Sequence, residues 1–105
     1  MLQPLAPGEA RIEGGLWASR QRLNREVLIP AGRRELERAG NFANLRAAAS
    51  GRGEYRGFVF QDSDLHKWLE AVGHELERAP SPELQRLADE TTALLEAAQD
   101  DDGYL

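Results

Sequence analysis

Apolar residues recur every three or four positions in two stretches of the chain, and polar residues fill the positions between them. The first stripe follows the helical steps i, i+3, i+4, i+7 and i+11 through Leu65, Trp68, Leu69, Val72 and Leu76. The second keeps the same period through Leu84, Leu87, Thr91, Leu94, Leu95 and Ala98. Such spacing places each set on one face of a helix. The pattern therefore predicts helices over residues 63–78 and 82–98.

Start and stop signals agree with these two helices. Asp62 or Ser63 is a suitable N-terminal cap for the first helix, and Pro80 ends it. The second helix opens with a capping hydroxyl, a proline at the first helical position and an early acid, supplied by Ser81, Pro82 and Glu83. Because the connection is so short, we expect the two helices to be antiparallel neighbours.

The beginning of the chain has weaker signals. Residues 1–15 contain prolines and glycines without a sustained period, and they are typical of an irregular lead-in. From residue 16 the apolar positions fit an amphipathic helix, which Pro30 must end or kink because proline lacks an amide donor. Residues 33–39 extend or restart this helix, and Gly40 is a natural stop.

The middle of the chain is predicted to hold one short helix and one brief extended segment. Asn41 is a candidate cap for a helix over residues 42–49, which a serine and two glycines then interrupt. Residues 55–60 form an aromatic and β-branched run of the kind found in strands. Trp17 and Trp68 have aromatic faces that could stack on a sugar ring, but they lie at helical spacing, and we expect both in the core because an indole buries a large area. The fold class is therefore all-α, with about four helices.

Composition excludes several classes of function. The chain has 105 residues, and 13 Lys and Arg against 18 Asp and Glu give a net charge of −5, which disfavours binding to nucleic acid or to an anionic membrane surface. There is no cysteine, so neither a disulfide nor a thiolate metal site can form within these residues. No secretory signal or membrane-spanning run is evident. We therefore expect a soluble, cytoplasmic protein.

Asp62 and Asp64 are the candidate functional carboxylates, and they flank Ser63 at a predicted helix start. Paired carboxylates are typical of glycosidases, in which one acts as an acid and the other as a base or nucleophile. Acids in a first helical turn also have a purely structural explanation, because they satisfy free amides and complement the helix dipole. From the residues alone, the pattern favours this structural role.

Two other polar clusters are weaker candidates for chemistry. His66, Glu70 and His74 lie four residues apart on one helical ridge, so their side chains could converge on a metal ion. A solvated face is favoured, because the ridge lies beside the apolar stripe and histidine is commonly exposed. Residues 100–103 have the composition of a calcium loop, but the position that should begin such a loop is Ala98, which offers no side-chain oxygen. No metal ligand and no catalytic residue is assigned in this chain.

A longer motif adds to this interpretation. Residues 60–71 resemble the Phe-(Asn/Gln)-Asp-Ser-Asp-Val-x-Lys-Trp-Leu-Glu-Ala signature of glycoside hydrolase family 127, the β-L-arabinofuranosidases. Four further segments resemble that family in the same order, namely residues 15–17, 24–30, 44–46 and 102–105. The departures are mild, with Leu16 and Leu45 in place of aromatic residues and Leu65 in place of valine.

The resemblance implies an (α/α)6 barrel that hydrolyses non-reducing terminal β-L-arabinofuranosides with retention. In that family the nucleophile is a cysteine thiolate held on zinc by other cysteines and a glutamate, and a second glutamate is the acid/base. Residues 16–105 would be the N-terminal part of the catalytic domain, after the lead-in of residues 1–15. We therefore expect a truncated chain without catalytic residues, inactive alone, with zinc and an arabinose-containing oligosaccharide bound only by the full-length protein.

The resemblance also gives the two aspartates separate roles. One of them, by preference Asp62, is expected to cap the helix that carries Leu65, while the other faces the barrel interior near the sugar hydroxyls, so both Asp62 and Asp64 are candidate substrate-binding residues. Apolar stripes without their barrel partners predict marginal stability or self-association of the isolated chain. The alternative is a freestanding helical interaction module that has kept the sequence and lost the chemistry.

Overall fold

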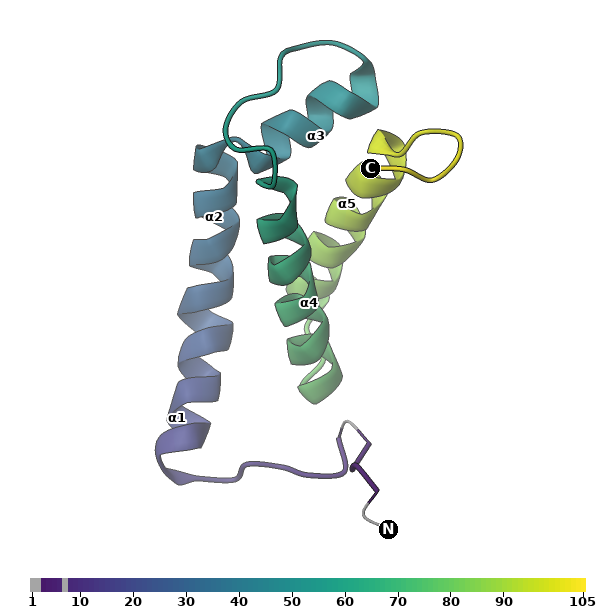
Figure 1. The fold of residues 1–105 in the computed structure, drawn as a ribbon. Coiled ribbons are helices and arrows are strands. Elements are labelled where there is room, and N and C mark those ends of the chain that lie inside the picture. The colour runs from purple at the N-terminus through teal and green to yellow at the C-terminus, as the bar shows by residue number, and fades with distance from the viewer. Residues whose placement is uncertain (1–2, 7) are drawn as a thin grey trace.

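The computed structural model describes residues 3–6 and 8–105, and helices are the regular structure throughout this part of the chain. In chain order these are α1 (Gly15–Leu23), the π-helical turn η1 (Asn24–Leu28), α2 (Ile29–Ala39), α3 (Asn41–Ser50), α4 (Asp62–Arg78) and α5 (Pro82–Ala98). Because α1, η1 and α2 join end to end, the described residues form four helical rods (Figure 1). The predicted all-α class with about four helices is confirmed. No described helix is long and apolar enough to cross a membrane.

The first rod passes through Pro30 without ending. The turn before the proline is π-helical, and the Ile29 amide donates to the carbonyl of Asn24, five residues back. Proline in a regular α-helix removes one hydrogen bond and clashes with the carbonyl four residues earlier, and a wider turn accommodates this locally. Of the two expected alternatives, residues 33–39 therefore extend the helix and do not restart it, and a π-helical turn precedes Pro30 in place of an end.

Gly40 separates α2 from α3, as expected. Its left-handed conformation, with φ of 94°, ends α2 and at the same time occupies the N-cap position of α3. The prediction that Asn41 caps this helix is wrong. Asn41 is the first residue of α3, its side chain is buried, and its amide nitrogen donates to the carbonyl of Gln61 in the next loop.

Helices α4 and α5 have nearly the predicted bounds and lie side by side in opposite directions (Figure 1). Ser81 caps α5 as expected, because its Oγ accepts a hydrogen bond of 3.3 Å from the Leu84 amide. Besides α5, helix α4 contacts both α2 and α3. This position makes α4 the central helix of the fold.

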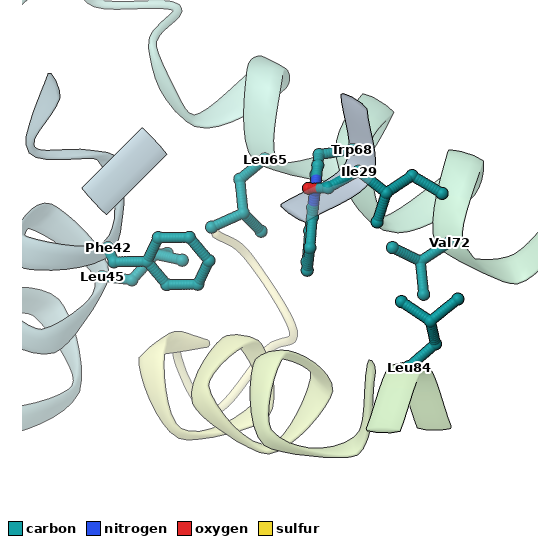
Figure 2. Close-up of a cluster of buried hydrophobic side chains, with 7 residues drawn as sticks. All are labelled: Ile29, Phe42, Leu45, Leu65, Trp68, Val72 and Leu84. Atoms are coloured by element: carbon teal, nitrogen blue, oxygen red, sulfur yellow. The ribbon is translucent and has the colours of Figure 1, made fainter. Parts of the chain in front are cut away.

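The core gathers around the buried stripe of α4 (Figure 2). It consists of Ile29, Phe42, Leu45, Leu65, Trp68, Val72 and Leu84. The Trp68 indole nitrogen donates to the Ile29 carbonyl at 2.9 Å, and the Phe42 ring meets the indole edge-on, at 6.4 Å between centroids. The remaining apolar residues of the two predicted stripes, including Leu69, Leu76 and Leu87, are partly buried against this cluster.

A polar cluster around Glu75 binds the first rod to α4. Glu75, buried on α4, accepts hydrogen bonds from Arg25 at 3.2 Å and from Arg78, and Arg25 also donates to the carbonyl of Ala79 at 2.8 Å. A buried carboxylate needs such partners because desolvation disfavours its charge. Arg25 therefore fixes the end of α4 against the π-helical turn.

Trp17 is not in the core, contrary to expectation. Its exposed fraction is 67%, and its apolar neighbours on the same rod, including Leu16, Leu23, Val27 and Leu28, are exposed as well. The helical period there is correct, but the other described helices do not cover this face of the rod. Periodicity specifies a face, and burial requires a second element packed on it.

Candidate functional site

Asp62 and Asp64 lie in the first turn of α4, but neither caps it. Gln61 occupies the N-cap position, and no side chain caps the helix. The expectation that Asp62 or Ser63 is the cap is therefore wrong. The backbone explains this, because the preceding turn already supplies acceptors: the Ser63 amide donates to the Phe60 carbonyl at 3.1 Å, and the Asp64 amide to the Gln61 carbonyl at 3.4 Å.

The two carboxylates differ in their surroundings. Asp64 is exposed and forms an ion pair of 3.1 Å with Lys67, one turn further along α4. Asp62 is half-buried, and its side chain takes part in none of the hydrogen bonds formed by the described residues. Of the pair, Asp62 is thus the carboxylate that is available to a ligand.

The loop that leads into α4, residues 51–61, contains turns and bends and is not the extended segment predicted for residues 55–60. Asn44 on α3 holds its middle, because the Asn44 amide donates to the Arg56 carbonyl at 2.8 Å and its oxygen accepts from the Arg56 amide at 3.0 Å. The Asn44 side chain thus satisfies both backbone groups of Arg56, as a neighbouring strand would do in a sheet. The loop arches over one end of the rods (Figure 1).

Gln61 anchors the end of this loop. Its side-chain amide donates to the Ala39 carbonyl at 2.7 Å and to Asn41 at 3.3 Å, while its own carbonyl accepts from Asn41. Gly57 packs directly against it: a Cβ on this glycine would lie 1.6 Å from the Gln61 Oε1, and the φ of 101° also favours glycine. The start of α4 is therefore fixed to the α2–α3 junction.

Between these two anchors the loop presents aromatic side chains to solvent. The Phe58 and Phe60 rings stack with 5.4 Å between centroids and 3° between planes. Tyr55 is exposed too, and its hydroxyl donates to the Phe58 carbonyl. The sequence pattern identified these residues as an apolar run but did not predict that the rings are exposed. Their exposure depends on the Asn44 contact, which joins residues twelve positions apart.

The remaining polar clusters do not come together as sites. His66 and His74 are exposed on α4, and His74 lies 3.8 Å from Glu70 across one helical turn. Residues 100–103 form a turn in which the Gly103 amide donates to the Asp100 carbonyl at 2.8 Å. Among residues 3–6 and 8–105, no three histidine, aspartate or glutamate side chains are placed to hold a metal ion. With no cysteine in the chain either, these residues do not fit the thiolate zinc site implied by the resemblance.

Comparison with known proteins decides the family. Residues 9–105 match the family model of the β-L-arabinofuranosidase GH127 catalytic domain. The chain belongs to glycoside hydrolase family 127. Over 64 residues it is 50% identical to the non-reducing end β-L-arabinofuranosidase of Bifidobacterium longum subsp. longum, a match that covers 60% of this chain and 10% of that protein.

The fold agrees with this membership. The solved structure of a GH127 β-arabinofuranosidase superposes with a TM-score of 0.83 and 31% identity, over 90% of this chain and 15% of that one. The helices described here thus correspond to a part of its (α/α)6 barrel. The chain spans a small fraction of the length of both relatives.

Proposed function

We propose that this GH127 chain is part of a glycosidase that releases non-reducing terminal β-L-arabinofuranosyl residues from an arabinose-containing oligosaccharide, with retention of configuration. The observation that carries the proposal is the family match over residues 9–105, together with a superposition that covers nearly the whole chain. We infer that the catalytic nucleophile and acid/base, and the zinc implied by the family, come from outside these 105 residues.

Within this chain, we assign substrate binding to the start of α4. Asp62 is the stronger candidate, because it is half-buried and not engaged by another described side chain, whereas Asp64 already forms an ion pair with Lys67. A carboxylate that accepts a hydrogen bond from a sugar hydroxyl forms a charge-assisted bond, which is stronger than its neutral equivalent. Asp62 would orient the sugar without taking part in bond cleavage.

The activity is tested on the complete reading frame that contains these 105 residues, with p-nitrophenyl β-L-arabinofuranoside as substrate. We expect turnover above a buffer blank that survives repurification, and no turnover from residues 1–105 alone, because the chain holds no cysteine nucleophile. A complete frame that binds no arabinofuranoside and releases no nitrophenol would instead support the helical interaction module.

Asp62→Asn and Asp64→Asn in the same frame test the substrate-binding role. Asp62→Asn should lower kcat/KM about tenfold, the effect of weakening one charge-assisted hydrogen bond. Both variants should keep the thermal midpoint, because neither side chain caps α4. Asp89→Asn, an equivalent change on the exposed surface of α5, is the matched control. If both site variants keep wild-type kcat/KM, the acidic pair is only part of a helix start.

A further inference from the structure

The loop before α4 exposes several large apolar side chains to solvent. Phe58 is 72% exposed and Phe60 62%, and Tyr55 and Val59 beside them are exposed as well. Several adjacent aromatic side chains are normally buried, because the free energy gained by removing apolar surface from water grows with the area removed. A flexible loop would fold these rings back onto the protein.

The contacts of the loop prevent this. Asn44 fixes the backbone of Arg56 on one side of the aromatic pair, and Gln61 is held by α2 and α3 on the other. Between them, the backbone amide of Gln61 donates to the Phe58 carbonyl at 3.0 Å, which closes a turn over residues 58–61. The stacked pair is therefore preorganised, so a ligand would not have to order it.

The position of the pair relates it to the acidic helix start. The turn that contains Phe58 and Phe60 runs straight into α4, where the Ser63 amide bonds the Phe60 carbonyl. Asp62 is only two residues beyond Phe60 and is half-buried. A flat apolar surface next to an available carboxylate is the combination that a sugar requires, since a sugar ring has an apolar C–H side and polar hydroxyls at its edge.

We propose that the stacked Phe58–Phe60 pair is a carbohydrate-binding platform on which one ring of an arabinofuranosyl oligosaccharide lies, with its hydroxyls toward the start of α4. This inference rests on the proposed function and names the residues that contact its substrate. The carboxylate of Asp62 beside the rings favours a sugar over a purely apolar protein contact, because sugar hydroxyls need a hydrogen-bond acceptor there.

The test is binding of a β-L-arabinofuranosyl disaccharide to the complete reading frame, followed by calorimetric titration and by KM. Phe58→Ala and Phe60→Ala should each weaken binding about tenfold, as expected for the loss of one aromatic stacking surface. Phe60→Tyr keeps the flat ring and should restore wild-type binding. Val59→Ala, in the same loop, and Tyr104→Ala, an exposed aromatic in the turn after α5, are the matched controls and should bind as the wild type does.

Unchanged affinity in both phenylalanine variants, with helicity retained, would overturn the proposal, and so would the absence of sugar binding by the complete frame. Self-association that Phe58→Ala abolishes, without any sugar binding, would also overturn it in favour of a protein contact. Failure of the proposed function is separate. A complete frame that hydrolyses arabinofuranosides with the same KM in every variant retains the function and loses the platform.

Discussion

The two tryptophans of the chain lie in regions with similar sequence patterns, but the structure buries one and exposes the other. Each is on a helix among apolar residues at helical spacing. Trp68 is 7% exposed and contacts Phe42 and the backbone of Ile29, whereas Trp17 is 67% exposed. In the described part of the chain, α1 forms no side-chain hydrogen bond or ion pair to another helix.

The difference shows what decides burial in this fold. Helix α4 is surrounded by α2, α3 and α5, so its apolar stripe meets three other helices at once. Helix α1 extends beyond them at one end of the first rod (Figure 1). The same amphipathic pattern therefore gives a core around Trp68 and an exposed face around Trp17, because hydrophobic burial depends on the partner as well as on the pattern.

Truncating the two tryptophans should give the largest contrast. Trp68→Ala removes a buried indole and leaves a cavity among Phe42, Leu65 and Val72, so it should lower the free energy of unfolding by about 3–5 kcal/mol. Trp17→Ala should change it by less than about 0.5 kcal/mol, as exposed substitutions usually do. Urea unfolding followed by far-UV circular dichroism measures both.

A control separates packing from the indole hydrogen bond. Trp68→Phe keeps an aromatic ring but loses the donor to the Ile29 carbonyl, and should cost less than Trp68→Ala. Equal effects of alanine at positions 17 and 68 would contradict the comparison and would mean that the α1 face is covered in solution.

How far the sequence could predict this fold depended on whether the contacts were local. The bounds of α5 were predictable because Ser81, Pro82 and the leucine stripe all act within a few residues. The π-helical turn and the Asn41 contact were not predictable, because each depends on another residue. The π-helical turn accommodates Pro30, and the Asn41 side chain donates to a carbonyl in a loop twenty residues away. Asn41 has the residue type of a cap, and tertiary contacts gave it another role.

The candidate site divides in the same way. Asp62 and Asp64 were found from their position at a helix start and from the resemblance of residues 60–71 to GH127. The expected side-chain cap is absent, because the preceding turn removes the need for it, and Lys67 forms an ion pair with Asp64. The stacked aromatic pair was not predicted because its loop is held by residues distant in the sequence: Asn44 on α3 binds Arg56, and Ala39 and Asn41 bind Gln61.

Two glycines test how tightly the Trp68 region is packed. A Cβ on Gly32 would lie 2.9 Å from Cδ1 of the buried indole, so Gly32→Ala adds overpacking of about 1–3 kcal/mol against a gain in helix propensity of about 1 kcal/mol. We expect a net destabilisation of about 1 kcal/mol, since Trp68 is held by Ile29 and cannot move aside.

Gly73→Ala is the matched change, because this glycine is exposed in the interior of α4 and nothing lies within 4 Å of the added Cβ. It should stabilise the protein by about 0.5–1 kcal/mol. The two substitutions thus have opposite expected signs in the thermal midpoint. A stabilising Gly32→Ala would show that the indole has room to shift and that the core is looser than its contacts indicate.

The smallest effect concerns the charged border of the same packed region, where Glu37 joins α2 to α3. Hydrogen bonds from Arg46 and then from Arg33 hold the pKa of Glu37 below its ordinary value of 4.5, and Arg33 also lies over the Phe42 ring at 3.4 Å. A lowered pKa in the folded state means that this contribution to stability is complete above pH 4.5 and is lost as the pH falls through the lower, folded value. Because the carboxylate is nearly half exposed, we expect Glu37 to add well under about 1 kcal/mol to the free energy of unfolding.

Thermal midpoints from pH 6 to 3 should fall more steeply in the wild type than in Glu37→Gln, and added salt should narrow the difference between the two profiles. Parallel profiles would show that the pairs stabilise the folded and unfolded chains equally, and that the border of the core is held by packing alone.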